Sequence, residues 1–561
     1  VAPACALPIS LLLSACTNPF AAHYADYGHV QPVDRLRAAP ALDLGPFRQP
    51  EPPAQDTLPT LLPSGEPISL ALADCRAFAL ARNLDLQVAL VDPAIANASL
   101  SEQEAAFEAL FFTNARYVDT DTPTASTLNS AQQEFLSIEP GVRIPLRTGG
   151  TAEVSVPYNR TETNNAFSTL NPSYEADLEL TLSQPLLRGA GRFAATQGIR
   201  IASYNRQISE ARTTLAVIAE LARVDRTYWS LYRAREELIV RQKQYELANA
   251  QLGRAERQLR AGRVAEIEVV RAQAGLADRL DAILQAEQAV LRETRELKRR
   301  INAPGLDVDS PEPILTLSPP DPARYVLNPA ELSDVAIARR MELLEVELQL
   351  LADAANVRLR QSELLPLLNA DLTYRLNGLG DSTSDAFDRL ADNDFTDWAV
   401  GLRAEVPIGN QAAESRLRQS ILTRLQRLST RQSREQTVRQ EVFDAVDRID
   451  AGWQRILAAR QSVVLNRRAF EAEERQFGAG ANTSTDVLDA AARLADAETA
   501  EIRAIVDYQI ALVDLAAATG TLIGSARVRW EPTPYDPAMG EFVPDSLREP
   551  WAAPSADNDE G

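Results

Sequence analysis

The order of apolar and polar positions divides much of the chain into long stretches with a helical period and short stretches that alternate. Two stretches, residues 197–260 and 411–477, carry apolar side chains at intervals of three and four and contain no proline. They are rich in Ala, Arg, Glu, Gln and Leu, which favour helices. At about 1.5 Å per residue, each helix would extend about 95–100 Å. The pattern therefore predicts two helices far longer than those of ordinary globular domains.

Each long stretch leads into a predicted turn and a shorter returning helix, and a further helical stretch precedes each group of strands. Two shorter helices stacked end to end would match one long helix along its length. Taken alone, the helical pattern also fits a cytoplasmic coiled-coil rod. The turns are expected at 261–262 and 479–480, the returning helices at 264–300 and 484–519, and the other helices at 67–109 and 329–363.

Between the helices the period changes to two. Apolar residues alternate with polar ones at 174–183, 368–377 and 398–407, and Val154, Val156 and Tyr158 suggest another strand. Strands of this length, with one apolar and one charged face, fit a lipid-facing barrel wall. Half-buried strands of a soluble antiparallel sheet would give the same alternation. Two strands in each half would give four per chain, too few to close a transmembrane barrel, so chains would have to associate.

The two halves of the chain also match each other in sequence. Residues 257–262 resemble 475–480, and residues 79–82 resemble 336–339, in the same order along the chain. These matches predict an internal duplication. The repeats would occupy 66–305 and 325–525. The first repeat is longer in its strand region, where residues 142–158 predict an added β-hairpin. Whether this hairpin widens a barrel or folds outside it stays open at this point.

The two ends of the chain have a different character. Residues 1–16 form a short apolar segment in which Leu13-Ser14-Ala15-Cys16 resembles the lipobox of bacterial lipoproteins, with Cys16 as the lipidated residue. An ordinary signal peptide that contains a cysteine is the alternative. Residues 17–65 are expected to be a Pro-rich tether, and 530–561 an acidic, Pro-rich tail.

Composition excludes several classes of function. The formal net charge of −21 argues against general nucleic-acid binding. Three cysteines and two histidines fall in no metal-ligand spacing, and no P-loop, G-x-S-x-G or H-E-x-x-H motif is present. We therefore expect neither an enzyme nor a bound cofactor or metal.

The residues that follow the second long helix resemble a known family. Phe477-Gly478-Ala479-Gly480 is followed by Asp486-Val487-Leu488-Asp489-Ala490, and Gln184-Pro185-Leu186-Leu187 ends a strand. With the duplication, this order resembles the outer-membrane efflux protein (TolC) family, in its lipoprotein-type form, over residues 66–525.

The resemblance implies an α+β membrane protein, in which a long α-helical periplasmic barrel is joined to an outer-membrane β-barrel. It implies a homotrimer with twelve strands and twelve helices, in contact with outer-membrane lipid. The chain would be the passive channel subunit of a tripartite efflux or type I secretion system, with a periplasmic adaptor and an inner-membrane transporter as partners. A secreted or lipid-anchored coiled-coil scaffold without a pore is the competing hypothesis. The exported substrate and the transporter class stay open.

The resemblance also implies functional residues. Asp486 and Asp489 would ring the periplasmic aperture, with Glu268 at the position of an acidic partner. The alternative for these acids is the stabilisation of a helix N-terminus. The adaptor would dock at the turns that contain Gly262, Val264 and Gly480.

Two positions depart from the family pattern. Asn482 and Phe477 stand where the family has an arginine and a tyrosine that lock the entrance. An amide and a phenyl ring cannot make the same salt bridge and phenol hydrogen bond. We therefore expect a more weakly or differently latched entrance.

Overall fold

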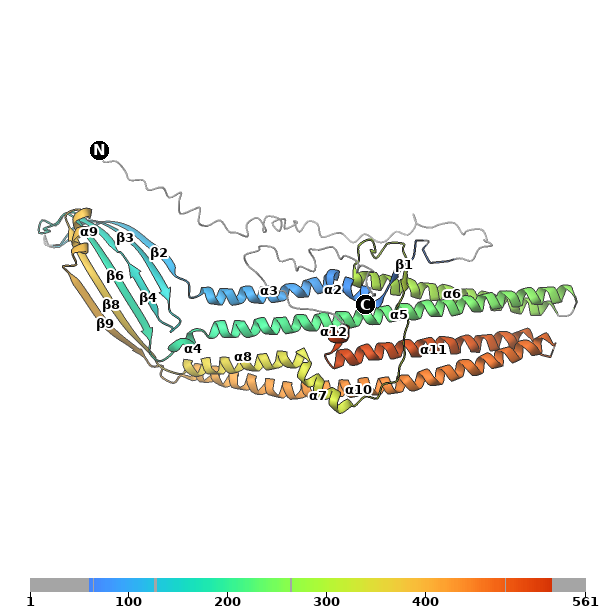
Figure 1. Cartoon of the computed structure of the whole chain (residues 1–561). Helices are drawn as coiled ribbons and strands as arrows, with labels where there is room; N and C mark the ends of the chain where they lie inside the picture. Colours follow the sequence, from blue (N-terminus) through green and yellow to red (C-terminus); the bar gives the residue numbers. More distant parts are fainter. Residues whose placement is uncertain (1–59, 64, 126–128, 263–264, 480, 527–561) are drawn as a thin grey trace, which may run out of the picture. The chain divides into compact units, whose positions relative to one another are not determined.

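Two long helices organise the structure, α5 (Gln197–Arg260) and α10 (Gln411–Gly478) (Figure 1). Both predicted helices are confirmed, with their ends displaced by at most one residue. No proline interrupts either helix, so the backbone hydrogen bonds continue over the whole length.

The computed structural model describes residues 60–526, apart from 64, 126–128, 263–264 and 480. Four expectations therefore fall wholly or mainly outside the described residues. They are the signal and lipobox segment with Cys16, the tether, the acidic tail, and the turn positions Val264 and Gly480. All of these stay predictions.

Each long helix folds back into a shorter one at its C-terminal end. Helix α6 (Glu266–Ile301) packs along α5, and α11 (Ser484–Ala518) packs along α10 and also against α5. Both returning helices are confirmed. In the first turn, Gly262 has a φ of +69°, a conformation in which only glycine is unstrained.

The remaining helical stretches are each broken into two helices, where one continuous helix was predicted. The breaks fall at Asn83 and Arg340, both with extended backbones. The side-chain Oδ1 of Asn83 accepts a hydrogen bond from the backbone N–H of Leu86 at 2.8 Å, so Asn83 caps a new helix. The helices are α2 (Leu72–Arg82), α3 (Leu84–Ala105), α7 (Pro329–Arg339) and α8 (Met341–Glu363).

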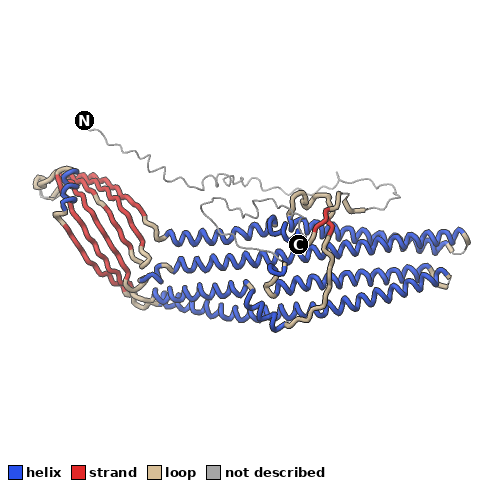
Figure 2. Tube along the Cα trace, viewed as in Figure 1, coloured by secondary structure: helices blue, strands red, loops and turns tan. Residues whose placement is uncertain are grey.

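The expected end-to-end stacking of short helices beside a long one is confirmed. Where α6 ends and α3 begins, Asn83 Nδ2 donates to the Arg300 carbonyl at 2.9 Å, and Asn302 Nδ2 donates to the Arg82 carbonyl at 3.0 Å. Helices α8 and α11 both pack along α10. Four helices therefore lie side by side near the strands, in the order α3, α5, α8, α10. Four also lie side by side at the other end, in the order α6, α5, α11, α10 (Figure 2).

The strands form one antiparallel sheet in the order β2-β3-β4-β6-β8-β9, and β5 also pairs with β3 and β6. Strands β4 and β5 keep the same register on both neighbours and are separated only by Val156 and Pro157. They act as one strand, interrupted where proline lacks an N–H. The strands are β2 (Leu110–Asp121), β3 (Gln132–Pro145), β4 (Thr151–Ser155), β5 (Tyr158–Thr163), β6 (Ser173–Pro185), β8 (Leu367–Gly380) and β9 (Thr396–Glu405).

The expectation of four strands per chain is wrong, because the sheet has six strand positions. The predicted hairpin is present and joins the sheet between β2 and β6, because β3 pairs with β2 on one side and with β4 and β5 on the other. Four positions therefore come from the first half of the chain and two from the second.

Several short elements were not predicted. Strands β1 (Ile68–Leu70) and β7 (Ile314–Thr316) form a parallel pair. The helices α4 (Gly191–Ala195), α9 (Thr383–Asp392) and α12 (Leu522–Ser525) are also new. The strands and the helices α4 and α12 are too short to show a period of their own in the sequence. Helix α9 carries apolar residues at 386, 387 and 390, a helical spacing that could have identified it.

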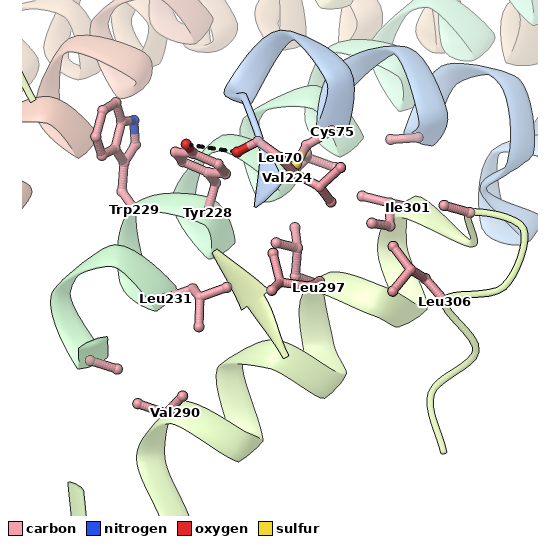
Figure 3. Close-up of a cluster of buried hydrophobic side chains, with 14 of the residues drawn as sticks. Leu70, Cys75, Val224, Tyr228, Trp229, Leu231, Val290, Leu297, Ile301 and Leu306 are labelled. Atoms are coloured by element: carbon pink, nitrogen blue, oxygen red, sulfur yellow. Dashed lines mark hydrogen bonds between the residues drawn. The ribbon is translucent and has the colours of Figure 1, made fainter. Parts of the chain in front are cut away.

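The β1–β7 pair lies on the largest buried apolar cluster, which α2, α5 and α6 complete (Figure 3). Tyr228 donates through its hydroxyl to the Leu70 carbonyl at 3.3 Å and accepts from the Ser318 backbone N–H at 2.8 Å. Beside this cluster, Arg76 makes two 2.7 Å hydrogen bonds to the carboxylate of Asp225, whose side chain is fully buried. These contacts tie α2 and the β1–β7 pair to the middle of α5.

Candidate functional site

One face of the sheet is apolar and largely open to solvent. In two neighbouring rows of the paired register, apolar residues stand opposite one another, and one of these rows crosses all six strand positions while the next crosses five. Trp398 at one end of a row is 74% exposed, and Phe111 at the other end is 60% exposed. That row consists of Phe111, Val142, Val154, Leu180, Tyr374 and Trp398, and the next contains Ile144, Ala152, Leu182, Leu372 and Val400.

An open apolar surface of this extent is unusual for a soluble monomer and indicates contact with lipid or protein. From Leu368 to Leu376, the apolar positions of β8 cover eight residue steps. With a rise of about 3.3 Å per residue and a strand tilt of about 40°, these steps span about 20 Å along a barrel axis. The apolar band on membrane barrels has a similar height, about 25 Å.

The opposite face of the sheet is polar, and its side chains pair across strands. Arg143 contacts Glu153 at 2.7 Å, and Arg375 contacts Glu179 at 2.6 Å. Ser183 donates to Asp371 at 2.6 Å. The two faces thus differ as the outside and inside of a membrane barrel do.

The connections between strands differ at the two ends of the sheet. At the end next to the helices, β3 and β4 are joined by the short turn 146–150. At the far end, the connections 122–131, 164–172 and 381–395 are longer, and the last contains α9 (Figure 1). Outer-membrane barrels have short periplasmic turns and longer extracellular loops, which places the helices on the periplasmic side in such a setting.

Helix α9 covers the far end of the apolar face. Ala386 is fully buried above Gly378 and Gly380, and a Cβ at either glycine would collide with α9. The ring of Phe387 stacks on that of Tyr158 at 6.2 Å between centroids. The small residues of β8 thus make room for this helix.

Both edges of the sheet are open in a single chain. Strand β2 pairs only with β3, and β9 pairs only with β8, so each has one side whose backbone groups have no strand partner among the described residues. Residues 106–109 connect β2 to α3, and 406–410 connect β9 to α10. Open edges of this length invite pairing with another chain.

At the end of the second helix hairpin, Asp486 has a defined local role. Its Oδ2 accepts hydrogen bonds from the Thr483 backbone N–H at 2.9 Å and from the Thr483 hydroxyl at 2.6 Å. The Asp486 N–H donates to Thr483 Oγ1 at 3.3 Å, which completes a capping box. The hydrogen bonds from Thr483 lower the pKa of Asp486. Within one chain, Asp486 therefore stabilises the N-terminus of α11, which is the alternative to a role at the aperture.

The other predicted entrance residues lie in both hairpins. Asp489 is exposed on the same helix, three residues beyond Asp486, and has no hydrogen bond or ion pair within the described part of the chain. Glu268 lies in the first turn of α6, where Arg271 donates to it at 2.8 Å. No contact in a single chain brings Glu268 together with Asp486 or Asp489.

The two positions that depart from the family pattern make different contacts: Asn482 contacts its own hairpin, and Phe477 lies beside residues of α5 in the first hairpin. Asn482 Nδ2 donates to the Glu473 carbonyl at 3.1 Å and also to its carboxylate. Phe477 is half-buried in a shallow pocket with Arg254 and Glu474, which form an ion pair at 3.6 Å. Asn482 thus holds the turn to α10, a role that the sequence did not reveal.

The polar pairs of the sheet were also missed, although their residue types were visible. Alternation places Glu179 and Arg375 on the polar face, but only the register between β6 and β8 makes them partners. Opposite charges on two neighbouring strands were the available signal.

Two kinds of feature are absent from the described residues. No helix among them has the length and apolarity needed to cross a membrane. No group of three or more His, Cys, Asp or Glu side chains among them is arranged to hold a metal ion.

The chain is similar to known proteins in sequence and in fold. Residues 332–521 match the family described as outer membrane efflux protein. The outer membrane protein TolC of Vibrio cholerae serotype O1 (strain ATCC 39315 / El Tor Inaba N16961) is 29% identical over 170 residues, which are 30% of this chain and 38% of that protein. The TolC of Escherichia coli (strain K12) is 26% identical over 314 residues, 53% of this chain and 60% of that protein.

The matched parts thus span less than two thirds of either relative. Among solved structures, the CmeC outer membrane channel of Campylobacter jejuni has a TM-score of 0.60 at 17% identity, covering 80% of this chain and 86% of that one. This likeness extends the shared fold over most of the described residues.

Proposed function

Since the chain belongs to the outer membrane efflux protein family, we propose that it is the outer-membrane channel subunit of a tripartite efflux or type I secretion system. The channel conducts substrates passively from the periplasm to the exterior. The family consists of outer-membrane channel proteins, so the chain is not an enzyme.

The observation that carries this proposal is the two-faced sheet. Its apolar rows are exposed across every strand position, and its polar face carries paired charges. A barrel wall needs one face for lipid and one for water. A scaffold protein without a pore gives no reason for so large an open apolar face, so no separate observation favours that alternative.

The proposed channel function also implies how the chain is placed in the membrane and with which partners it assembles. The sheet lies in the outer membrane and the helices in the periplasm, as the short turn at the helical end supports. The channel is a homotrimer that engages a periplasmic adaptor and, through it, an inner-membrane transporter. The two repeats, 66–305 and 325–525, arose by duplication, a proposal supported by the order of elements, in which two short helices, strands, a long helix and a returning helix occur twice.

The functional residues of the channel are proposed from the positions that match the family. Asp486 and Asp489, with Glu268, form an acidic aperture where three chains meet, which favours cations. Asp489 has the freer carboxylate, because Asp486 already caps α11. Gly262, Val264 and Gly480 form the turns that receive the adaptor, and Cys16 carries the lipid.

The test is the conductance of the purified protein in planar bilayers, beside an Asp486→Asn/Asp489→Asn variant. We expect discrete, cation-preferring channels whose cation preference falls in the variant. The matched control is Asp496→Asn/Asp507→Asn, which removes the same charge from exposed positions further along α11 and should leave selectivity unchanged.

The possible outcomes separate the parts of the proposal. Well-folded protein that forms no channels would overturn the channel function. Channels whose selectivity is the same in both variants would keep the channel and remove the aperture. Asn482→Arg tests the latch separately: an arginine here should lower the resting conductance, and an unchanged conductance would contradict a weakened latch.

A further inference from the structure

The six strand positions have a consequence for the assembled channel. We propose that its outer-membrane barrel contains eighteen strand positions, six from each of three chains, instead of the twelve that four strands per chain would give. Each seam joins β9 of one chain to β2 of the next. The number of chains rests on the proposed function, whereas the width contributed by each chain rests on the sheet itself.

The sheet cannot close within one chain. Six strand positions are fewer than the eight of the smallest membrane barrels, and β2 and β9 lie at opposite edges. Pairing β9 with β2 of a second copy removes both edges by one repeated contact. A contact between two different surfaces of the same chain generates a ring when its rotation closes.

The helices that continue from these edges carry matching apolar rows. On α3, Ile95, Val91 and Val88 lie ten, fourteen and seventeen residues before its end at Ala105, and all three are exposed. On α10, the same distances after its start at Gln411 bring Ile421, Leu425 and Leu428, which are exposed too. Because α3 leads into β2 and α10 follows β9, these two rows lie at similar distances from the sheet.

The same two helices have opposite charge. Helix α3 contains four acidic residues and no lysine or arginine. The first part of α10, residues 411–434, contains six arginines and one glutamate. In the described part of the chain, Asp92 on α3 and Arg424 on α10 make no ion pair, and both lie thirteen residues from the sheet end of their helix. Opposite charges favour α3 against α10 of a second copy, and disfavour α3 against α3.

The width of the sheet agrees with the width of the helical layer. In a barrel, strands about 4.8 Å apart and tilted by about 40° each occupy about 6.3 Å of circumference, so six positions span about 38 Å. Four helices side by side, at about 9–10 Å each, span about 36–40 Å. Four strands would span only about 25 Å. Six positions therefore let barrel and helical tube close with the same circumference.

The test measures the barrel directly. A spin label at Thr373→Cys, on the polar face in the middle of β8, gives one distance between the chains of a symmetric trimer. The native Cys5 and Cys75 are first changed to alanine, and Cys16 is kept, because the proposed lipid occupies its thiol. Eighteen strand positions predict about 31 Å between Cα atoms, and twelve predict about 21 Å.

The matched control shortens the sheet within the same protein. Replacing residues 122–172 by a two-residue turn removes β3, β4 and β5 and brings β2 beside β6. The rows keep their faces, because Phe111 and Leu180 belong to one row. We expect this variant to give the shorter distance. If it fails to fold, the distance in the full chain still decides.

The outcomes distinguish this inference from the proposed function. A trimer that forms channels but gives about 21 Å, the distance expected of twelve strand positions, would overturn the wide barrel and leave the channel function intact. Protein that neither trimerises nor conducts would overturn the channel function. Asp92→Arg should weaken the trimer and Arg424→Asp in the same chain should restore it; no rescue would refute the proposed seam.

Discussion

Helices α5 and α10 have similar length and composition, yet they occupy different places. Helix α5 has neighbours along both sides, namely α3, α6, α8 and α11, and Val217, Tyr228 and Leu231 are fully buried on it. Helix α10 packs against α7, α8 and α11 and leaves Leu425 53% exposed. A helical period therefore identifies the helix, whereas its neighbours decide which of its apolar residues form the core of one chain.

The ends of the two hairpins differ in the same way. Helix α11 begins with the capping box of Thr483 and Asp486, whereas Ala265 precedes α6 and offers no side-chain cap. The first hairpin is thus better buried along its length and less well capped at its end. The predictions that follow test this contrast, from the largest expected effect to the smallest.

Arg76→Ala should destabilise the first half most, by about 4 kcal/mol, because it leaves the Asp225 carboxylate buried without its partner. Burial raises the pKa of Asp225 above its unfolded value. Such a group favours folding when it is protonated and loses this contribution as pH rises through the folded pKa. Arg76 lowers the pKa of Asp225, so its removal should raise this pKa further. The variant's loss in unfolding free energy should therefore be larger at pH 8, where the carboxylate is charged, than at pH 5, measured by denaturant titration with circular dichroism.

The matched change in the second half is Arg340→Ala, which separates an arginine from Glu342 and Glu441. Both carboxylates are partly exposed, so water replaces the lost contacts and the expected loss is smaller. Equal losses of unfolding free energy in the two variants would contradict this contrast between the two halves. A loss in Arg76→Ala that does not depend on pH would contradict it too.

Leu231→Ala should cost about 3 kcal/mol of unfolding free energy, because the Leu231 side chain is fully buried and its truncation leaves a cavity. Leu425→Ala removes the same atoms from an exposed position on α10 and should hardly change helix melting. If α10 packs against a second copy, this variant should instead dissociate the trimer at lower temperature. Thermal melts and size-exclusion chromatography in detergent separate the two effects.

Thr483→Ala should cost about 1 kcal/mol, because it removes the cap of α11. Hydrogen exchange of the first turn of α11 should rise, while exchange in α6 stays unchanged. An unchanged rate in α11 would mean that its capping box contributes nothing to the stability of the turn.

Ala265→Ser supplies the cap that α6 lacks and should stabilise its first turn by up to about 1 kcal/mol. The expected result is slower exchange at Glu268 and its neighbours. Faster exchange would show that the uncapped end is shaped by contacts outside the hairpin.

The sequence allowed the long helices to be predicted closely, because residues 197–260 carry a strong period and no breaker. It did not reveal the break at Asn83, where a tertiary hydrogen bond to the Arg300 carbonyl outweighs local helix propensity. The added hairpin was visible in the sequence, but its place between β2 and β6 depends on pairing between distant segments. Asp486 was found by its motif, and a role at a helix N-terminus was among the alternatives, but its pairing with Thr483 in a capping box is visible only in the structure.

Helix α9 has a consequence for the thickness of membrane that this chain fits. By covering Gly378 and Gly380, it ends the apolar band on β6 and β8 before the strands themselves end. The remaining band, about 20 Å high, suits a bilayer thinner than average, as bacterial outer membranes are. In a thicker bilayer the lipid would have to thin around the protein, at a fraction of a kcal/mol for each Å of mismatch. A helix packed outside the strands thus sets the hydrophobic mismatch.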